Sequence, residues 1–187
     1  MGINTVAVAH HFIKQYVHEG DFCIDATAGR GRDTELLCRL VGETGRVLAF
    51  DIQKEAVFET QERLEAAGLA SRCEVIHNSH TEMEQYAEPG SVRCIVFNFG
   101  YLPGGDHGVF TTAETSIPAL EAGMRLLAPG GVMSLSIYYG GETGYDERDA
   151  LLEFLKTVDN KGYTVLAGSF ANRPNDPPIP VFLWKDV

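Results

Sequence analysis

The 187-residue sequence predicts an α/β fold of the Rossmann-like type, with a mostly parallel seven-stranded sheet and helices on both of its faces. Three observations predict it. Short apolar runs alternate with longer segments whose apolar residues recur every three or four positions, which favours strand–helix–strand crossovers. Two of the runs end in an aspartate, Asp25 and Asp51. The last two runs have no helical segment between them, which predicts an antiparallel hairpin at one edge of the sheet.

The first half of the chain is expected to supply three strands and the helices that join them. Residues 4–18 place apolar side chains on one helical face, so this segment is expected to pack on the sheet or to cover a ligand site. Asp33 is a predicted N-cap of the helix that follows the first strand. The predicted elements after residue 18 are strands over 22–25, 46–51 and 72–76 and helices over 33–41, 52–68 and 81–87.

The second half is expected to supply four strands and two helices. Ser116 is the predicted cap of a helix that ends near Leu127, with Pro118 in its first turn. Pro129-Gly-Gly131 is expected to break the chain before the next strand. The predicted elements are strands over 92–97, 132–138, 163–167 and 181–184, a helix up to 127 and a helix over 146–158.

Composition predicts one globular domain over residues 1–187, with the helix at 4–18 as part of it. No apolar run approaches the roughly 20 residues that span a membrane, and the N-terminus lacks a signal-peptide pattern, so the cytoplasm is the expected location. The histidines and cysteines do not have metal-ligand spacing, so no metal site is expected. The net charge of −11 argues against loose, charge-driven binding of nucleic acid.

The stretch from Asp25 to Thr34 is the first candidate binding site. Gly29 and Gly31 follow a predicted strand and precede a helix, where backbone can approach a ligand and free N–H groups are available. The dinucleotide fingerprint needs a third glycine, and Thr34 stands at that position. The pattern D-x-x-x-G-x-G instead resembles the first motif of class I S-adenosylmethionine (SAM) methyltransferases. The candidate cofactor-binding residues of this stretch are Asp25, Ala26, Thr27, Gly29, Gly31, Asp33 and Thr34. A tight turn without a ligand is the alternative.

Polar residues also follow the other predicted strands. Ligands of open α/β sheets bind beyond the carboxyl ends of the strands, where these residues are expected to meet. The Asp51 carboxylate is suited to accept hydrogen bonds from both ribose hydroxyls, although it is also a plausible helix N-cap. The remaining candidates for cofactor binding are Gln53, Ser79, His80, Asn98 and Gly100.

Asn98-Phe-Gly-Tyr101 is the candidate catalytic segment, and it resembles the Asn/Asp-Pro-Pro-Tyr/Phe motif of methyltransferases that act on amino nitrogens. An amine attacks a sulfonium methyl only when it is neutral and its lone pair is aimed at the methyl carbon. Amide and carbonyl oxygens that accept its N–H bonds give it that orientation, and an aromatic ring such as Tyr101 holds a planar base by stacking. Asp106 and His107 are candidate proton acceptors, although each also suits a solvated turn.

The whole chain resembles a small bacterial family of rRNA-methylase-like proteins. The resemblance rests on Asp25-Ala-Thr-x-Gly-x-Gly-x-Asp-Thr34, Phe50-Asp-Ile-Gln53, Ser79-His80, Phe97-Asn-x-Gly-Tyr-Leu-Pro-Gly-Gly-Asp-His107 and Asn172-x-x-Asn175-x-Pro-Pro178. It implies the class I methyltransferase fold and SAM as cofactor. It also implies methylation of 5-aminomethyl-(2-thio)uridine at the wobble position of tRNA, an activity found in this family.

Because the chain is acidic, we hypothesise that its contact with tRNA is local, around one anticodon loop, and that a homodimer helps to form it. Leu102, Pro103, Asn172 and Asn175 are candidate RNA-binding residues, and Arg30, Arg32, Lys14 and Arg173 are candidate phosphate contacts. Two departures bear on the substrate: Arg30 stands where the family usually has asparagine, and residues 138–144 lack the histidine of the family pattern. The alternatives are methylation of rRNA or of a small amine, a nicotinamide-dependent oxidoreductase, and a SAM-binding protein without activity.

Overall fold

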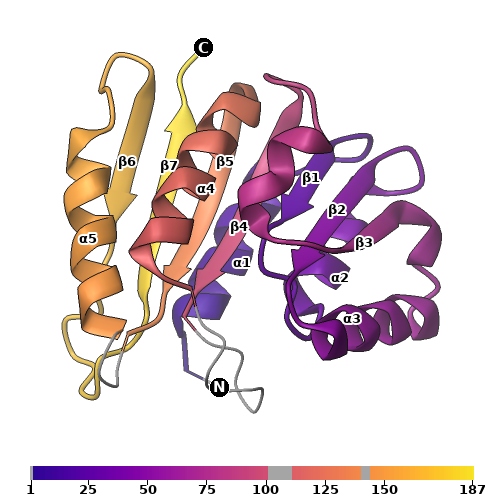
Figure 1. Cartoon of the computed structure of the whole chain (residues 1–187), viewed down its shortest axis with the longest axis horizontal. Helices are drawn as coiled ribbons and strands as arrows, with labels where there is room; N and C mark the ends of the chain where they lie inside the picture. The colour runs from indigo at the N-terminus through magenta and orange to yellow at the C-terminus, as the bar shows by residue number, and fades with distance from the viewer. Residues whose placement is uncertain (1, 101–110, 140–143) are drawn as a thin grey trace.

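One seven-stranded sheet, in the order β3-β2-β1-β4-β5-β7-β6, forms the centre of the protein (Figure 1). The computed structural model describes residues 2–100, 111–139 and 144–187. The strands are β1 (Phe22–Asp25), β2 (Arg46–Asp51), β3 (Cys73–His77), β4 (Val92–Phe99), β5 (Leu127–Ile137), β6 (Tyr163–Ala167) and β7 (Ile179–Lys185). Neighbours among the first five strands pair in parallel, so their carboxyl ends meet at one edge of the sheet.

The expected antiparallel hairpin is confirmed at the other side of the sheet. β7 pairs antiparallel with both β5 and β6, so the last strand of the chain is inserted beside β5 and β6 becomes the edge strand. The class predicted from the sequence, a mostly parallel seven-stranded α/β sheet, is therefore confirmed.

Helices cover both faces of the sheet (Figure 1). One face carries α1 (Thr5–Tyr16), α2 (Arg32–Val41) and α3 (Lys54–Ala66), and the other carries α4 (Ala113–Leu126), α5 (Gly144–Thr157) and the 3₁₀ helix η2 (His80–Gln85). A 3₁₀ turn, η1 (Ala70–Arg72), leads into β3. Each face has its own hydrophobic core, because the central strands are buried on both sides.

The N-terminal helix packs on the sheet, as the sequence predicts. Phe12 stacks on Phe182 of β7 with ring centroids 4.2 Å apart, and it meets Trp184 edge-on at 5.2 Å. Ile13 is fully buried in the same core. This packing fixes the first turn of α1 beside the carboxyl ends of the strands, where the candidate site lies.

Three expectations about element ends are wrong. Asp33 is not the N-cap of α2, because the helix begins at Arg32 and Gly31 is the capping residue. Ser116 does not cap α4, because Thr112 caps it and Ser116 is buried within the helix. Pro129-Gly-Gly131 lies inside β5, where a shift in the β4–β5 register accommodates the irregular backbone, so β5 starts earlier than expected.

None of the described helices combines the length and the apolar character that crossing a bilayer requires.

Candidate active site

A cavity of about 330 Å³ opens at the carboxyl ends of the parallel strands. Its walls come from the segments that follow β1, β2, β3 and β4, together with Val6 of α1, Thr115 of α4 and Tyr138 after β5. The predicted cofactor residues that line it are Ala26, Thr27, Gly29, Asp33, Asp51, Gln53, Ser79, His80, Asn98 and Gly100. Residues far apart in the sequence thus meet at one site, as the strand-end argument predicts.

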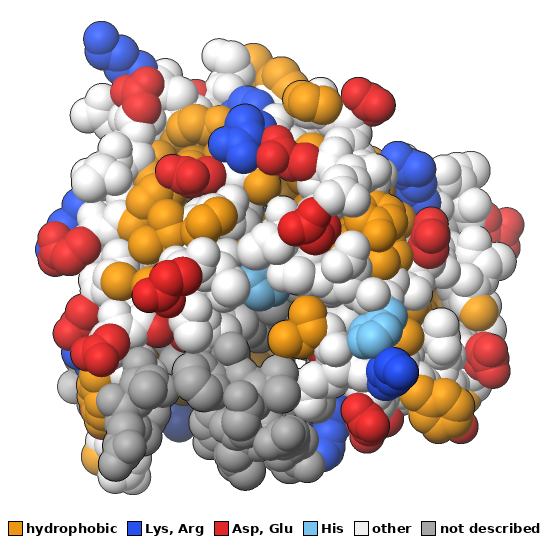
Figure 2. Space-filling model, viewed as in Figure 1, with side chains coloured by type: hydrophobic (Ala, Val, Ile, Leu, Met, Phe, Trp, Pro, Cys, Tyr) orange, Lys and Arg blue, Asp and Glu red, His pale blue; other side chains and the backbone are white. Residues whose placement is uncertain are grey.

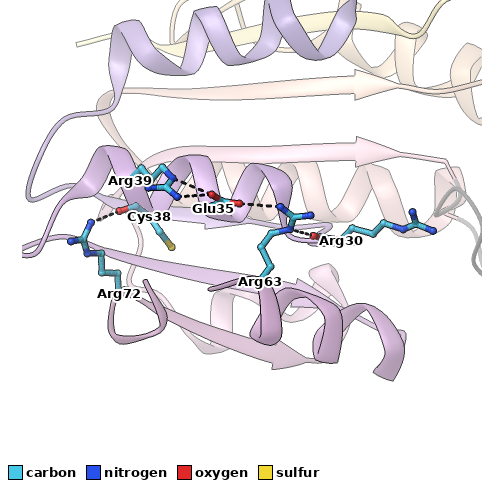
Figure 3. Close-up of polar contacts among 6 residues, drawn as sticks. All are labelled: Arg30, Glu35, Cys38, Arg39, Arg63 and Arg72. Atoms are coloured by element: carbon cyan, nitrogen blue, oxygen red, sulfur yellow. Dashed lines mark hydrogen bonds and ion pairs between the residues drawn. The ribbon is translucent and has the colours of Figure 1, made fainter. Parts of the chain in front are cut away.

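The turn after β1 takes a shape that requires glycine. Gly31 has a φ of +71°, and a Cβ there would lie 2.9 Å from the Oγ1 of Thr60 and 3.0 Å from its Cα. Thr60 Oγ1 donates a hydrogen bond to the Gly29 carbonyl at 3.1 Å, and Arg63 Nε donates to the Arg30 carbonyl at 2.7 Å (Figure 3). Side chains of α3 therefore hold the carbonyl groups of the turn, which leaves its other side to the cavity.

Arg63 also links the turn to α2. Its Nη1 forms an ion pair with Glu35 of α2 at 3.0 Å. Arg39, one turn further along α2, donates a hydrogen bond to the same carboxylate (Figure 3). These pairs are partly exposed, so their contribution is mainly to orient Arg63.

Asp25 and Thr34 lie behind the cavity wall rather than on it. Both side chains are fully buried, and Thr34 Oγ1 donates to Asp25 Oδ2 at 2.6 Å. The backbone N–H of Thr27 donates to the other carboxylate oxygen at 3.2 Å. Burial, followed by the negative charge of Asp33, raises the pKa of Asp25 to about 7. In this structure the two residues, like Gly31, shape the turn from within and do not line the cavity.

Asp51 organises the backbone at the opposite wall. Its Oδ2 accepts a hydrogen bond from Gly29 N–H at 2.9 Å, and its Oδ1 accepts one from Gln53 N–H at 2.9 Å. Each carboxylate oxygen can accept a further bond. Asp51 lines the cavity, so its free acceptor capacity is suited to a pair of vicinal hydroxyls.

Asn98 is held in one orientation by Asp33. β4 extends to Phe99, so Asn98 lies inside the strand and not beyond its end. Its backbone N–H donates to Thr27 Oγ1 at 2.7 Å, and its Nδ2 donates to Asp33 Oδ2 at 2.7 Å. Because the amide nitrogen faces Asp33, the Oδ1 of Asn98 is the acceptor that remains for a ligand in the cavity.

Sequence reasoning missed the residue that fixes Asp33. His10 of α1 places its Nε2 2.6 Å from Asp33 Oδ1, so the carboxylate is gripped from two sides by His10 and Asn98. The amphipathic pattern of 4–18 predicts that α1 packs on the sheet, but no local pattern reveals that His10 meets a residue 23 positions later.

His80 presents a buried nitrogen that has no hydrogen-bond partner among the described residues. Its ring meets the stacked Phe97 and Phe99 rings edge-on, with centroids 6.4 Å from each, and the residue is 9% exposed; the nitrogen without a described partner is Nε2. A buried polar atom without a partner is costly, so one that lines a cavity marks a position for a ligand atom.

We predict that His80 makes stability fall in mild acid. Burial lowers the pKa of His80 to about 4, against 6.5 for the ordinary residue. Between these values the unfolded chain binds a proton that the folded protein does not bind, so the free energy of unfolding decreases as pH falls, by roughly 3 kcal/mol over the interval. Urea titrations from pH 7.5 to pH 4.5 measure it.

The control is a pair of non-titrating variants, His80→Gln and His80→Phe. Subtracting the stability–pH profile of either variant from that of the wild type removes the contribution of the other titrating groups. The difference in the free energy of unfolding should rise with pH in the same way for both variants. Parallel profiles for the wild type and both variants would contradict the prediction.

Glu147 of α5 fastens the segment that follows Asn98. Its buried carboxylate accepts hydrogen bonds from Ser116 Oγ at 2.6 Å and Thr111 Oγ1 at 3.0 Å. Thr111 Oγ1 in turn accepts from Gly100 N–H at 2.7 Å, and Thr111 N–H donates to the Gly100 carbonyl at 3.0 Å. Burial raises the pKa of Glu147. Both ends of the 101–110 segment are thereby tied to one carboxyl group.

We predict that Glu147→Ala lowers the free energy of unfolding by about 2 kcal/mol, because it leaves two buried hydroxyl groups without their acceptor. Glu147→Gln keeps one acceptor and should lose less. Urea unfolding measures the change, and Glu153→Ala, which removes an exposed glutamate from the same helix, is the matched control. Equal losses in Glu147→Ala and Glu153→Ala would show that the network does not stabilise the fold.

The remaining predicted residues differ in where they lie. Tyr101, Leu102, Pro103, Asp106 and His107 fall outside the described residues. Arg30 and Arg32 line the cavity, and the Nε of Arg30 lies 3.6 Å from Glu59. Lys14 stands in the last turn of α1, whereas Val6, in the first turn, lines the cavity. Arg173 lines a second cavity, and neither Asn172 nor Asn175 lines either cavity.

The chain is similar in sequence and in fold to known proteins. The family model described as "Putative rRNA methylase" matches residues 47–184. A tRNA (mnm⁵s²U34)-methyltransferase, chloroplastic, of Arabidopsis thaliana is 36% identical over 95% of this chain and 68% of its own length. A crystal structure of the same rRNA-methylase description from Clostridium thermocellum is 44% identical, with a TM-score of 0.95 and 99% of each chain covered. A Streptococcus mutans methyltransferase in complex with SAH is 32% identical, with a TM-score of 0.89 over 99% of each chain.

Proposed function

The chain belongs to the rRNA methylase family of SAM-dependent methyltransferases, and from this premise we propose that it methylates a wobble uridine of tRNA. The proposed acceptor is the amine of 5-aminomethyl-(2-thio)uridine at position 34, and the product is the 5-methylaminomethyl form. The Arabidopsis relative is named as a tRNA (mnm⁵s²U34)-methyltransferase, which supports tRNA as the substrate. The cofactor of the reaction is SAM.

The fixed amide of Asn98 is the observation that carries the proposal. A neutral amine that donates an N–H to Asn98 Oδ1 has its lone pair directed away from that oxygen, and a single defined direction is what an in-line displacement needs. Asp33 prevents the amide from turning, because it holds Nδ2 at 2.7 Å. Orientation by a preset acceptor lowers the entropy that the reaction must lose at its transition state.

The cavity fits the cofactor on three counts. The Asp51 carboxylate offers acceptors to ribose hydroxyls, Gly29 lines the cavity beside it with no side chain in the way, and His80 Nε2 has no hydrogen-bond partner among the described residues. When bound, SAM would supply a methyl group on a sulfonium: the N–C bond forms as the C–S bond breaks, and the sulfur would keep the electron pair as a neutral thioether. The carboxylate of Asp33 also favours a positively charged ligand in the cavity.

The transferred methyl group leaves a cationic amine that must lose one proton. We propose Asp106 or His107 as the acceptor of that proton. The side chains that orient the amine and the group that takes the proton are thus separate parts of the mechanism.

The acidic character of the protein opposes broad, charge-driven RNA binding, so a contact with RNA has to be local. The net charge is −11, and on the face shown in Figure 2 the lysine and arginine side chains stand singly among acidic ones. We propose that binding depends on a few cations at the cavity mouth, Arg30 and Arg32 among them, and that a homodimer extends this surface.

Nucleoside mass spectrometry of tRNA from a strain that lacks the gene tests the proposal. The expected result is accumulation of the 5-aminomethyl nucleoside, restored by the wild-type gene and not by one encoding Asn98→Ala. The family description favours rRNA as the second candidate, so the same strain is tested for a lost rRNA methyl group. Unchanged tRNA together with a missing rRNA methyl group would overturn the proposal in favour of that candidate.

A further inference from the structure

A second cavity, of about 210 Å³, adjoins the cofactor cavity. Val6 and Tyr138 line both cavities, so they form the partition between them. The outer walls come from opposite ends of the sequence, from residues 3–5 and from the segment between β6 and β7. Among the described candidate RNA-binding residues, Arg173 alone lines this cavity.

The two outer walls are fastened to each other. Thr5 is buried and its Oγ1 donates to the Pro178 carbonyl at 2.6 Å, while Arg173 Nη2 donates to the Ile3 carbonyl at 2.6 Å. The segment between β6 and β7 is also held by Tyr145, whose hydroxyl donates to Asp176 at 3.0 Å. The cavity is therefore a built feature of the fold and not a gap between two independent loops.

The chemistry of the walls suits a flat heterocycle that carries a phosphate. Phe170 and Tyr138 supply aromatic surface, and Pro177 and Pro178 supply apolar surface. The Arg173 guanidinium lies 5.7 Å from the centre of the Phe170 ring and donates one bond to the Ile3 carbonyl, and it forms no ion pair with a carboxylate among the described residues. Because no described carboxylate pairs with the guanidinium, its remaining N–H groups are available to a phosphate oxygen. They lie beside Phe170, the ring on which a base would stack.

The position of Tyr138 connects this cavity to the reacting atoms. Its backbone N–H donates to the Phe99 carbonyl at 3.0 Å, next to Asn98 in β4. A base in the second cavity therefore has only the Tyr138–Val6 partition between itself and Asn98, and a short substituent on the ring can reach past it. A base with an aminomethyl arm meets this requirement.

We propose that the second cavity receives the flipped-out pyrimidine of the acceptor nucleotide, with Phe170 under the base and Arg173 on a flanking phosphate. The inference rests on the proposed function, since it names where the substrate of that reaction sits. It separates the two ligands: the cofactor occupies the cavity between Asp51 and Asn98, and the acceptor nucleotide enters from the side of residues 3–5 and 170–178.

The test measures methyl transfer to an anticodon stem–loop RNA with 5-aminomethyl-2-thiouridine at position 34. Phe170→Ala should raise KM for the RNA about 10-fold through loss of stacking. Arg173→Ala should lower the slope of log KM against log salt concentration by about 1, and Arg173→Lys should retain that slope. Both variants should keep the wild-type Kd for SAM in calorimetry, which also reports an intact fold.

Two surface variants serve as matched controls, Phe58→Ala on α3 and Lys161→Ala in the turn before β6, because both residues are exposed and line neither cavity. A KM in Phe170→Ala within twofold of that in Phe58→Ala, with the wild type active, overturns the pocket assignment alone. If Phe170→Ala or Arg173→Ala loses affinity for RNA and for SAM to the same extent, the proposal that the two ligands occupy separate cavities is overturned. A wild-type protein that does not methylate this RNA overturns the proposed function and the pocket together.

Discussion

Replacing Asn98 with alanine is expected to lower kcat by about 10²- to 10³-fold, the range seen when one preorganised polar group or the correct geometry is lost. The variant loses the amide oxygen that orients the amine and leaves Asp33 with His10 as its remaining partner. Affinity for SAM should change little, because the backbone N–H of residue 98 still bonds to Thr27 Oγ1. Steady-state assays give kcat, and calorimetry gives the Kd for SAM.

Two further variants make the Asn98 experiment specific. Asn98→Asp keeps the size of the side chain but places a second carboxylate against Asp33, so it should be inactive as well. Asn160→Ala removes an exposed asparagine from the turn before β6 and should leave kcat unchanged. Activity of Asn98→Ala within tenfold of the wild type would show that the amide does not orient the acceptor.

Replacing Asp51 with alanine is expected to weaken SAM binding by about 100-fold, which corresponds to about 3 kcal/mol. The substitution removes the acceptors proposed for the ribose and releases the backbone N–H groups of Gly29 and Gln53, each now bound at 2.9 Å. The turn after β1 then loses its link to the end of β2. Calorimetric titration with SAM measures the effect.

The matched control for Asp51 is Glu55→Ala, which removes a negative charge from the first turn of α3 without touching the cavity. Asp51→Asn should fall between the wild type and Asp51→Ala, because it keeps one acceptor oxygen. Equal Kd values for Asp51→Ala and Glu55→Ala would mean that Asp51 contributes only its charge, and the proposed ribose contact would be abandoned.

The sequence predicts the place of a site residue in the fold where a short local pattern marks it. The aspartates that end β1 and β2 and the glycines between β1 and α2 were placed from short patterns alone. Asn98 was recognised from its motif, although β4 continues through it. Such features depend on residues within one turn or one strand end, which is the range over which sequence patterns are informative.

The contacts that fix those residues could not be predicted in the same way. Aspartate is a residue type that often caps helices, and Asp33 stands near the start of α2. Its two carboxylate oxygens are instead hydrogen-bonded to His10 and Asn98, which lie 23 and 65 positions away in the sequence. Glu147 binds side chains 31 and 36 positions away, and nothing in the pattern of α5 distinguishes it from its exposed neighbours. Pro129-Gly-Gly131 looked like a break because breaking propensities are local, whereas the pairing of β5 with β4 and β7 is set by the whole sheet.

The insertion of β7 between β5 and β6 affects the order in which the protein matures. α1 precedes the described strands in the sequence, yet Phe12 has its stacking partner, Phe182, in β7, the last of those strands. Contacts of such wide sequence separation form late in folding, because a long loop must close before they stabilise anything. The packing of α1 on the sheet therefore depends on β7 being in place, and a variant that loses β7 should release α1 as well.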